Sequence, residues 1–197
     1  MYNYISGTLA EVEATYAVID CHGVGYLLEI TLNTYSAIKD LKEVKLLVHE
    51  VIREDAHLLF GFYSSAEREM FRLLLGVNGV GAATARVMLS SLTVDELSKA
   101  IADQDARRVQ KVKGIGAKTA QRIILELRDK IDPVALGGTT SDSPSSSANA
   151  NVSEALSALV MLGFPKAASE KVLAKIADTN PGASVEELIK LSLAHGI

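Results

Sequence analysis

The chain has 197 residues, 48% of them hydrophobic, so it can bury a sizeable core in one domain or in several small ones. Its single cysteine, Cys21, excludes an internal disulfide and a cysteine-based zinc site, and the lack of tryptophan disfavours a base-stacking platform for single strands. No charged-then-apolar leader and no apolar run of about 18 residues is present. The sequence therefore predicts a cytoplasmic protein that does not enter a membrane.

The formal net charge of −4 is unevenly distributed along the chain. Residues 1–63 carry four Lys or Arg against nine Asp or Glu, residues 64–132 carry twelve against nine, and residues 133–197 carry four against six. The three segments have net charges of −5, +3 and −2. Only the middle segment has the local positive charge that contact with nucleic acid requires.

Residues 1–63 have the pattern of a small β-barrel, because short alternating or β-branched runs are separated by turn signals. The runs predict five strands: Ile5–Leu9, Tyr16–Asp20, Val24–Ile30, Val44–Ile52 and Leu58–Phe62. The more polar interval 31–39 can hold a short helix, as in an OB-fold. Glu54 and Asp55 fall between the last two strands, a position typical of a solvated hairpin tip. Two adjacent acids without a third ligand make a poor metal site, so we expect no metal.

Residues 64–132 predict an all-α domain that contains an internal repeat. Ser64-Ser65-Ala66-Glu67 has the spacing of a capping box, and a second box at Thr93–Glu96 opens a connecting helix. Between and after these lie two near copies, residues 77–85 and 112–120, which are identical at six of nine positions and 35 residues apart. Apolar patterns before and after each copy predict a helix, a tight hairpin and a second helix.

Each copy contains two glycines that bracket one apolar residue. Glycine permits the backbone angles of a hairpin that leads directly into a helix, and a bare backbone lets another molecule approach closely. The first N–H groups of the following helix lack intrahelical partners and lie at the positive end of the helix dipole, which favours a phosphate there. We expect the bracketed residues, Val80 and Ile115, to anchor each hairpin between its helices.

This pattern resembles the helix-hairpin-helix motif, which holds the DNA backbone without reading bases. One glycine pair before a helix is also an ordinary helix start, so the prediction depends on the duplication; tandem copies can bind phosphates on both sides of a minor groove. The basic residues near the second copy could equally form a solvated helix face. The predicted phosphate-binding residues are Gly79, Val80, Gly81, Ala82, Gly114, Ile115, Gly116, Ala117, Lys118 and Arg122.

Residues 133–151 lose all periodicity and are rich in Ser and Gly, which predicts a flexible linker. Residues 152–197 then predict three short helices, Ser153–Leu162, Lys166–Ala177 and Ser184–His195. Three helices with the turn Met161-Leu162-Gly163-Phe164-Pro165 resemble a ubiquitin-associated-type domain. Such a unit on a tether is usually a docking module, and the alternative is a solvated, stabilising tail.

An OB-like barrel, tandem helix-hairpin-helix motifs, a Ser-rich linker and a three-helix unit together resemble the RuvA family over the whole chain. Local segments that carry the resemblance are Gly23–Tyr26, Val51–Ala56, Leu59–Phe62 and the two glycine hairpins. The resemblance implies a fourfold-symmetric homotetramer that holds a four-way (Holliday) DNA junction in an open, nearly square form; whether four or eight subunits bind one junction stays open. It also implies docking of the hexameric RuvB ATPase on the third domain, with the RuvC resolvase as a further candidate partner.

The resemblance gives Glu54 and Asp55 a role as an acidic pin near the fourfold axis, where eight carboxylates from four subunits face the junction centre. Like charges there repel phosphates and keep separated strands apart. One departure concerns Ala83, which occupies the position that matches Lys118, where the family leads us to expect a basic residue. The first hairpin would then bind through its amides alone.

The sequence alone leaves two other functions open. Helix-hairpin-helix motifs also occur in DNA glycosylases and nucleases, but the flanking residues here, Arg86, Gln121 and Arg122, supply no catalytic acid or lysine. The chain could also be an adaptor for another ATPase. Because it has no G-x-x-x-x-G-K-[ST] loop, we expect neither ATP hydrolysis nor a cofactor.

Overall fold

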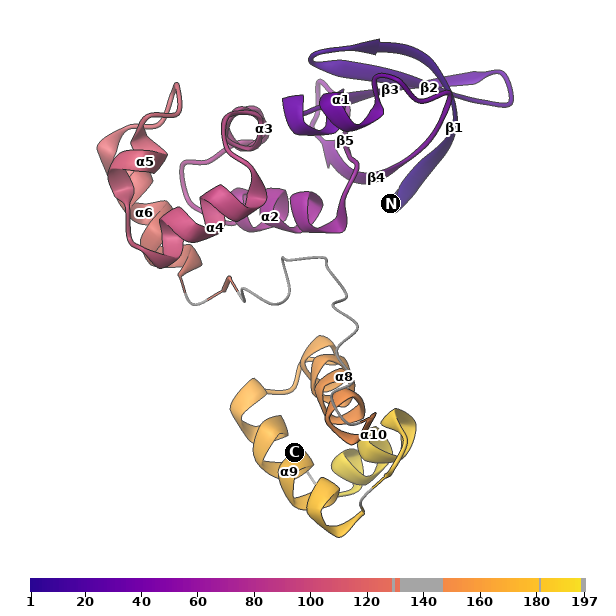
Figure 1. Ribbon diagram of the computed structural model, residues 1–197, viewed down its shortest axis with the longest axis vertical. Coiled ribbons are helices and arrows are strands. Elements are labelled where there is room, and N and C mark those ends of the chain that lie inside the picture. The colour runs from indigo at the N-terminus through magenta and orange to yellow at the C-terminus, as the bar shows by residue number, and fades with distance from the viewer. Residues whose placement is uncertain (129, 132–146, 181, 196–197) are drawn as a thin grey trace. The chain divides into compact units, whose positions relative to one another are not determined.

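The fold is described from a computed structural model, in which residues 1–128, 130–131, 147–180 and 182–195 are described. The chain divides into two compact units, residues 1–139 and 140–197 (Figure 1). Most of the predicted linker, residues 133–146 of 133–151, lies outside the described residues. No helix in the described parts is both long and apolar enough to span a membrane.

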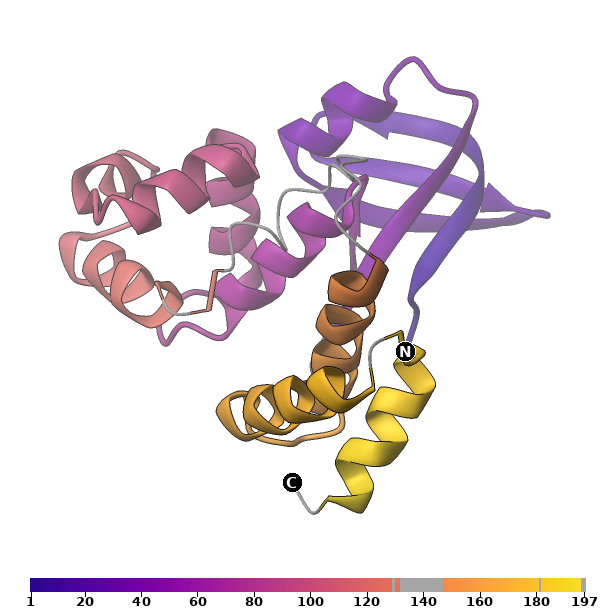
Figure 2. The same ribbon diagram turned by 60° about the horizontal axis from the view of Figure 1, so that its bottom comes forward.

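The amino-terminal residues form a closed five-stranded barrel with the strand order β1-β2-β3-β5-β4. All five predicted strands are confirmed, and the barrel closes through a parallel pairing of β3 with β5 while the other neighbours are antiparallel. The helix predicted between the third and fourth strands is also present, at the end of the barrel that faces the helical domain (Figure 2). The elements are β1 (Tyr4–Glu13), β2 (Tyr16–Cys21), β3 (Val24–Ile30), α1 (Leu32–Ile38), β4 (Glu43–Ile52) and β5 (His57–Phe62).

The next residues form the predicted all-α domain, which shares a core with one end of the barrel. Phe60 and Phe62 of β5 pack on Phe71 of α2, with ring centroids 5.1 and 4.9 Å apart. The core continues from there through buried aliphatic residues of every helix in this domain. The helices are α2 (Ser65–Leu75), α3 (Ala82–Ser91), α4 (Val94–Ala102), α5 (Ala106–Gln110) and α6 (Ala117–Leu127).

A buried carboxylate joins the barrel to the helical domain and corrects one sequence prediction. Ser64 accepts a hydrogen bond from the Glu67 amide, as a capping box requires, but the Glu67 side chain does not return to Ser64. It is buried and accepts hydrogen bonds from the hydroxyls of Thr31 and Thr34, the latter at 2.7 Å. Burial raises the pKa of Glu67, and the two threonine hydrogen bonds act in the opposite direction. The predicted box that begins α4 is complete, and Ser184 and Glu187 form a second complete box at the start of α10.

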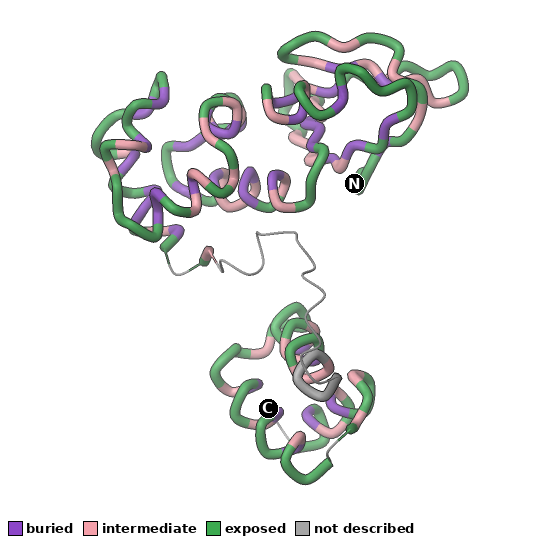
Figure 3. Tube along the Cα trace, in the orientation of Figure 1, coloured by how far each residue is buried: buried purple, intermediate pink, exposed green. Residues whose placement is uncertain are grey.

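The second unit contains the three predicted helices, α8 (Ser147–Met161), α9 (Lys166–Thr179) and α10 (Val185–Ala194). Their buried positions face one another in a small core of their own (Figure 3). Helix α8 begins at Ser147, six residues before the predicted start at Ser153, so residues 147–151 of the predicted linker are helical. Ala148 and Ala150 favour a helix in this stretch, whereas the serine and the two asparagines beside them disfavour it.

Candidate nucleic-acid interface

The two repeated segments form turns with the same geometry. In the first hairpin the Val80 amide donates to the Val77 carbonyl at 3.0 Å, and in the second the Ile115 amide donates to the Val112 carbonyl at 3.1 Å. The third residue of each turn is a glycine with a positive φ, +93° at Gly79 and +89° at Gly114. A side chain is strained in that region, so the first glycine of each pair is needed by the fold itself.

The second glycine of each pair has a different explanation. Gly81 and Gly116 have φ values of −92° and −81°, which any residue can adopt. A Cβ built at either position meets no atom within 4 Å. The sequence prediction treated both glycines of a pair alike, but the structure shows that the chain could accommodate alanine at the second. The missing side chains leave open space directly above the first amides of α3 and α6.

Those amides are unusual among the helix starts of the first unit. The residue just before each of α1, α2, α4 and α5 has a side chain that accepts a hydrogen bond from a backbone N–H of that helix. The residues just before α3 and α6 are Gly81 and Gly116, which make no such bond. Within the described part of the chain, the amides of Ala82 and Ala83, and of Ala117 and Lys118, have no hydrogen-bond acceptor. Two helix N-termini thus present free donors at the positive end of a dipole.

The apolar residue between the glycines fixes each hairpin, as the sequence predicted. Val80 and Ile115 are each only 6% exposed and belong to the core of the helical domain, whereas the flanking glycines are exposed. Anchoring one side of the turn leaves its backbone on the other side facing solvent. The buried side chain therefore fixes the position of each hairpin, and with it the position of the free amides.

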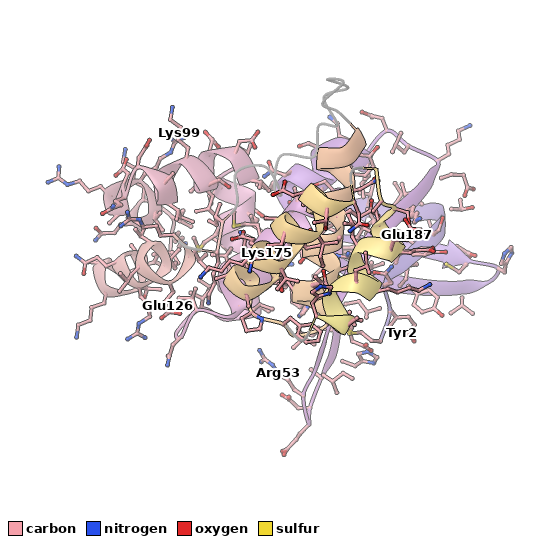
Figure 4. All side chains as sticks on the ribbon, turned by 90° about the horizontal axis from the view of Figure 1, so that it is seen from below. Tyr2, Arg53, Lys99, Glu126, Lys175 and Glu187 are labelled. Carbon is pink, nitrogen blue, oxygen red and sulfur yellow. The ribbon has the colours of Figure 1, made fainter. Side chains whose placement is uncertain are left out.

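Arg122 links α6, the helix that follows the second hairpin, to the first hairpin. From the second turn of α6, its Nη1 donates to the carbonyl of Asn78, in the first hairpin, at 3.1 Å. Its Nε lies 3.9 Å from a carboxylate oxygen of Glu126, which Figure 4 labels. The sequence placed Arg122 with the second hairpin only, and the structure adds this contact with the first. No sequence signal joins positions that are 44 residues apart.

The hairpins differ in charge and in attachment. Lys111, Lys113 and Lys118 are exposed around the second hairpin, whereas the first has Asn78 and Ala83 at the positions that match Lys113 and Lys118. Arg86, on the helix that follows the first hairpin, does not add to its charge. Its Nη1 lies 3.0 Å from a Glu29 carboxylate oxygen and donates to the Thr15 carbonyl at 3.1 Å. It fastens α3 to the barrel.

Glu54 and Asp55 lie where the sequence predicted, in the turn between β4 and β5. Both are exposed, and the turn is closed by a hydrogen bond of 2.8 Å from the Arg53 amide to the Ala56 carbonyl. Figure 4 shows the side chains around Arg53 extending outward at the end of this hairpin. In the described residues no set of three or more His, Cys, Asp or Glu side chains is arranged to hold a metal ion.

Comparison with known families covers all three parts of the chain. Residues 1–61 match the family described as "RuvA N terminal domain", residues 71–129 match "SAM-like Helix-hairpin-helix tandem", and residues 150–195 match "RuvA, C-terminal domain". The chain belongs to the RuvA family. Among its relatives, RuvA of Christiangramia forsetii is 47% identical over 193 residues, which are 98% of each chain. RuvA of Bacteroides thetaiotaomicron is 48% identical over 198 residues, again 98% of each chain.

Both relatives are named "Holliday junction branch migration complex subunit RuvA". Membership of the family decides between the functions that the motifs left open. The chain is a RuvA-family protein, and the relatives that match it over almost its whole length are named as branch migration complex subunits and not as glycosylases or nucleases.

Proposed function

We propose that this chain is the DNA-binding subunit of a Holliday junction branch migration complex, and that its two hairpins bind phosphates of the junction arms. The proposal is supported above all by the matched pair of free helix N-termini that follow Gly81 and Gly116, and Arg122 links the second of these helices to the first hairpin. Amides and dipoles recognise phosphate and not bases, so binding is independent of sequence. The predicted phosphate-binding residues, from Gly79 to Ala82 and from Gly114 to Lys118 with Arg122, are the proposed contacts.

The glycines supply the test. Gly81→Ala and Gly116→Ala place a methyl group in the space above the amides without a clash inside the protein. Each substitution is expected to weaken binding of a four-way junction by on the order of tenfold or more, because hydrogen bonds to a charged group contribute about 1.5–3 kcal/mol. Junction affinity is measured by mobility shift at several salt concentrations, beside a linear duplex, and folding by thermal unfolding. If both variants fold and bind the junction with unchanged affinity, the hairpins do not bind phosphate and the proposal is wrong.

Glu54 and Asp55 are proposed as an acidic pin that faces the junction centre in a homotetramer. Support comes from their exposure at a hairpin tip and from the net charge of −5 on residues 1–63. The carboxylates would repel phosphates and discourage duplex from entering at random. Replacing both with Gln and Asn is expected to tighten DNA binding and reduce the preference for junctions over duplex. Weaker binding, or a Mg²⁺-dependent cleavage that needs these acids, would contradict the proposal.

The second unit is proposed as the docking module for the RuvB hexamer. It has a core of its own, so it can fold without the barrel or the hairpins. A chain that ends at residue 132 is expected to bind junctions normally and to fail to support RuvB-driven branch migration. If the truncated chain supported branch migration at the normal rate, the docking proposal would be wrong and the second unit would be a stabilising tail.

Three further features of the assembly are also proposals. The chain is expected to act in the cytoplasm and to form a homotetramer, with four or eight subunits on one junction. Light scattering measures the number of subunits in the free protein and in its complex with one junction. RuvC is a candidate partner on the same junction, and a shift of the protein–junction complex on adding RuvC would support that contact.

A further inference from the structure

We infer that Arg122, although it belongs to the second hairpin motif, supplies the positive charge for the phosphate site of the first hairpin. The inference deepens the proposed function and rests on it. The geometry is direct: the Arg122 Nη1 donates to the carbonyl of Asn78, the residue that immediately precedes Gly79 in the first hairpin. The guanidinium is therefore located beside the turn of the other motif.

The first hairpin motif has no comparable cation of its own in the described structure. Position 83 is alanine where the second copy has Lys118, and position 78 is asparagine where the second copy has Lys113. The arginines on its two helices are engaged elsewhere: Arg68 with the Asn3 carbonyl at 3.0 Å, Arg72 with Glu69 at 2.8 Å and Arg86 with Glu29 at 3.0 Å. A phosphate at the first hairpin would meet amides alone unless charge came from outside the motif.

Arg122 is able to provide that charge. Its side chain is 50% exposed, so a DNA backbone can reach it. A guanidinium has five N–H donors, and the bond to Asn78 uses one of them. Glu126 is the acidic neighbour on the same helix, but at 3.9 Å and in partial contact with water it neutralises little of the charge. The remaining donors can bind a phosphate bidentately, which guanidinium does well.

The contact with Asn78 also suggests a purely positioning role, in which Arg122 only holds the hairpins together. Two substitutions separate charge from position. Arg122→Ala removes both, whereas Arg122→Gln removes the charge and keeps an N–H donor on a shorter side chain. Arg128→Ala is the matched control, because Arg128 is an exposed arginine at the end of the same helix.

The test is a double-mutant comparison of junction affinity. Arg122→Ala and Arg122→Gln are both expected to weaken binding by on the order of tenfold, while Arg128→Ala changes it far less. In a Gly81→Ala background, where the first site is already obstructed, Arg122→Ala is expected to add little. In a Gly116→Ala background the two losses are expected to multiply. Adding Ala83→Lys to Arg122→Ala is expected to restore binding and the dependence of affinity on salt.

The outcomes are distinguishable. If the loss from Arg122→Ala persists with Gly81→Ala and disappears with Gly116→Ala, Arg122 serves its own hairpin and the inference is wrong. If Arg122→Gln binds as well as the wild type, the residue acts by position alone and the inference about charge is also wrong. If neither glycine substitution alone weakens binding, the proposed phosphate sites fail and the inference fails with them. Thermal unfolding of each variant identifies any loss that comes from misfolding.

Discussion

The two hairpins have the same turn, yet they are attached and charged differently. The first is fastened to the barrel, because Arg86 of α3 contacts Glu29 and Thr15 while the Asn33 side chain of α1 donates to the Leu89 carbonyl at 2.6 Å. The second packs within the helical domain and is surrounded by lysines. The positions that are identical in the two copies thus determine the local geometry. The positions that differ between the copies set how strongly each hairpin attracts an anion, and residues outside the repeat determine where each hairpin is held.

The largest expected effect concerns how firmly each hairpin is anchored. Ile115→Ala is expected to lower the free energy of unfolding by about 2–5 kcal/mol, because a buried aliphatic side chain is lost and a cavity remains. Val80→Ala removes fewer methyl groups and is expected to cost about 2 kcal/mol. Urea unfolding measures both, with the exposed Val87→Ala as a control. A loss at Ile115 no larger than that at Val87 would mean that the second hairpin is not held by this side chain.

The difference in charge predicts a difference in salt dependence. Lys118→Ala is expected to reduce the slope of log affinity against log salt by about 0.9 for each phosphate contact that is lost, and Ala83→Lys is expected to increase it by a similar amount. The two substitutions exchange the charges of the matching positions in the hairpins. Mobility shifts over a salt series provide the slopes. Equal slopes for the wild type and both variants would show that neither position contacts phosphate.

The smallest expected effect is a pH dependence of the free energy of unfolding. It comes from Glu67 of α2, whose side chain connects the first hairpin motif to the barrel through Thr31 and Thr34. Burial raises the pKa of Glu67 in the fold above its value in the unfolded chain. The folded state therefore binds the extra proton more readily, so the contribution of Glu67 to stability is greatest at low pH and is lost as pH rises through the folded pKa. Unfolding of the wild type and of Glu67→Gln is compared between pH 4 and 8. The advantage of the wild type over Glu67→Gln is expected to decline with rising pH, and an increase would contradict this assignment.

Much of the fold could be predicted because it depends on local patterns. Alternating and β-branched runs identified the five strands, and glycine spacing identified both hairpins with their buried anchors, Val80 and Ile115. Contacts between distant segments could not be predicted in this way. The Glu67 side chain left its expected capping position for two threonines more than 30 residues away, and Arg122 reached the other hairpin. The roles of individual residues on DNA remain predictions.

The helix starts at Gly81 and Gly116 have a thermodynamic consequence. A serine or aspartate at the capping position just before a helix stabilises that helix, and glycine there stabilises it less by a few tenths of a kcal/mol. In the proposed complex a DNA phosphate takes the place of that side chain, so binding and helix stability are linked quantities. Gly81→Ser would make the free protein slightly more stable and its hold on DNA weaker. Backbone hydrogen exchange would report the same linkage, with the amides of residues 82–84 and 117–119 exchanging rapidly in the free protein and slowly once DNA is bound.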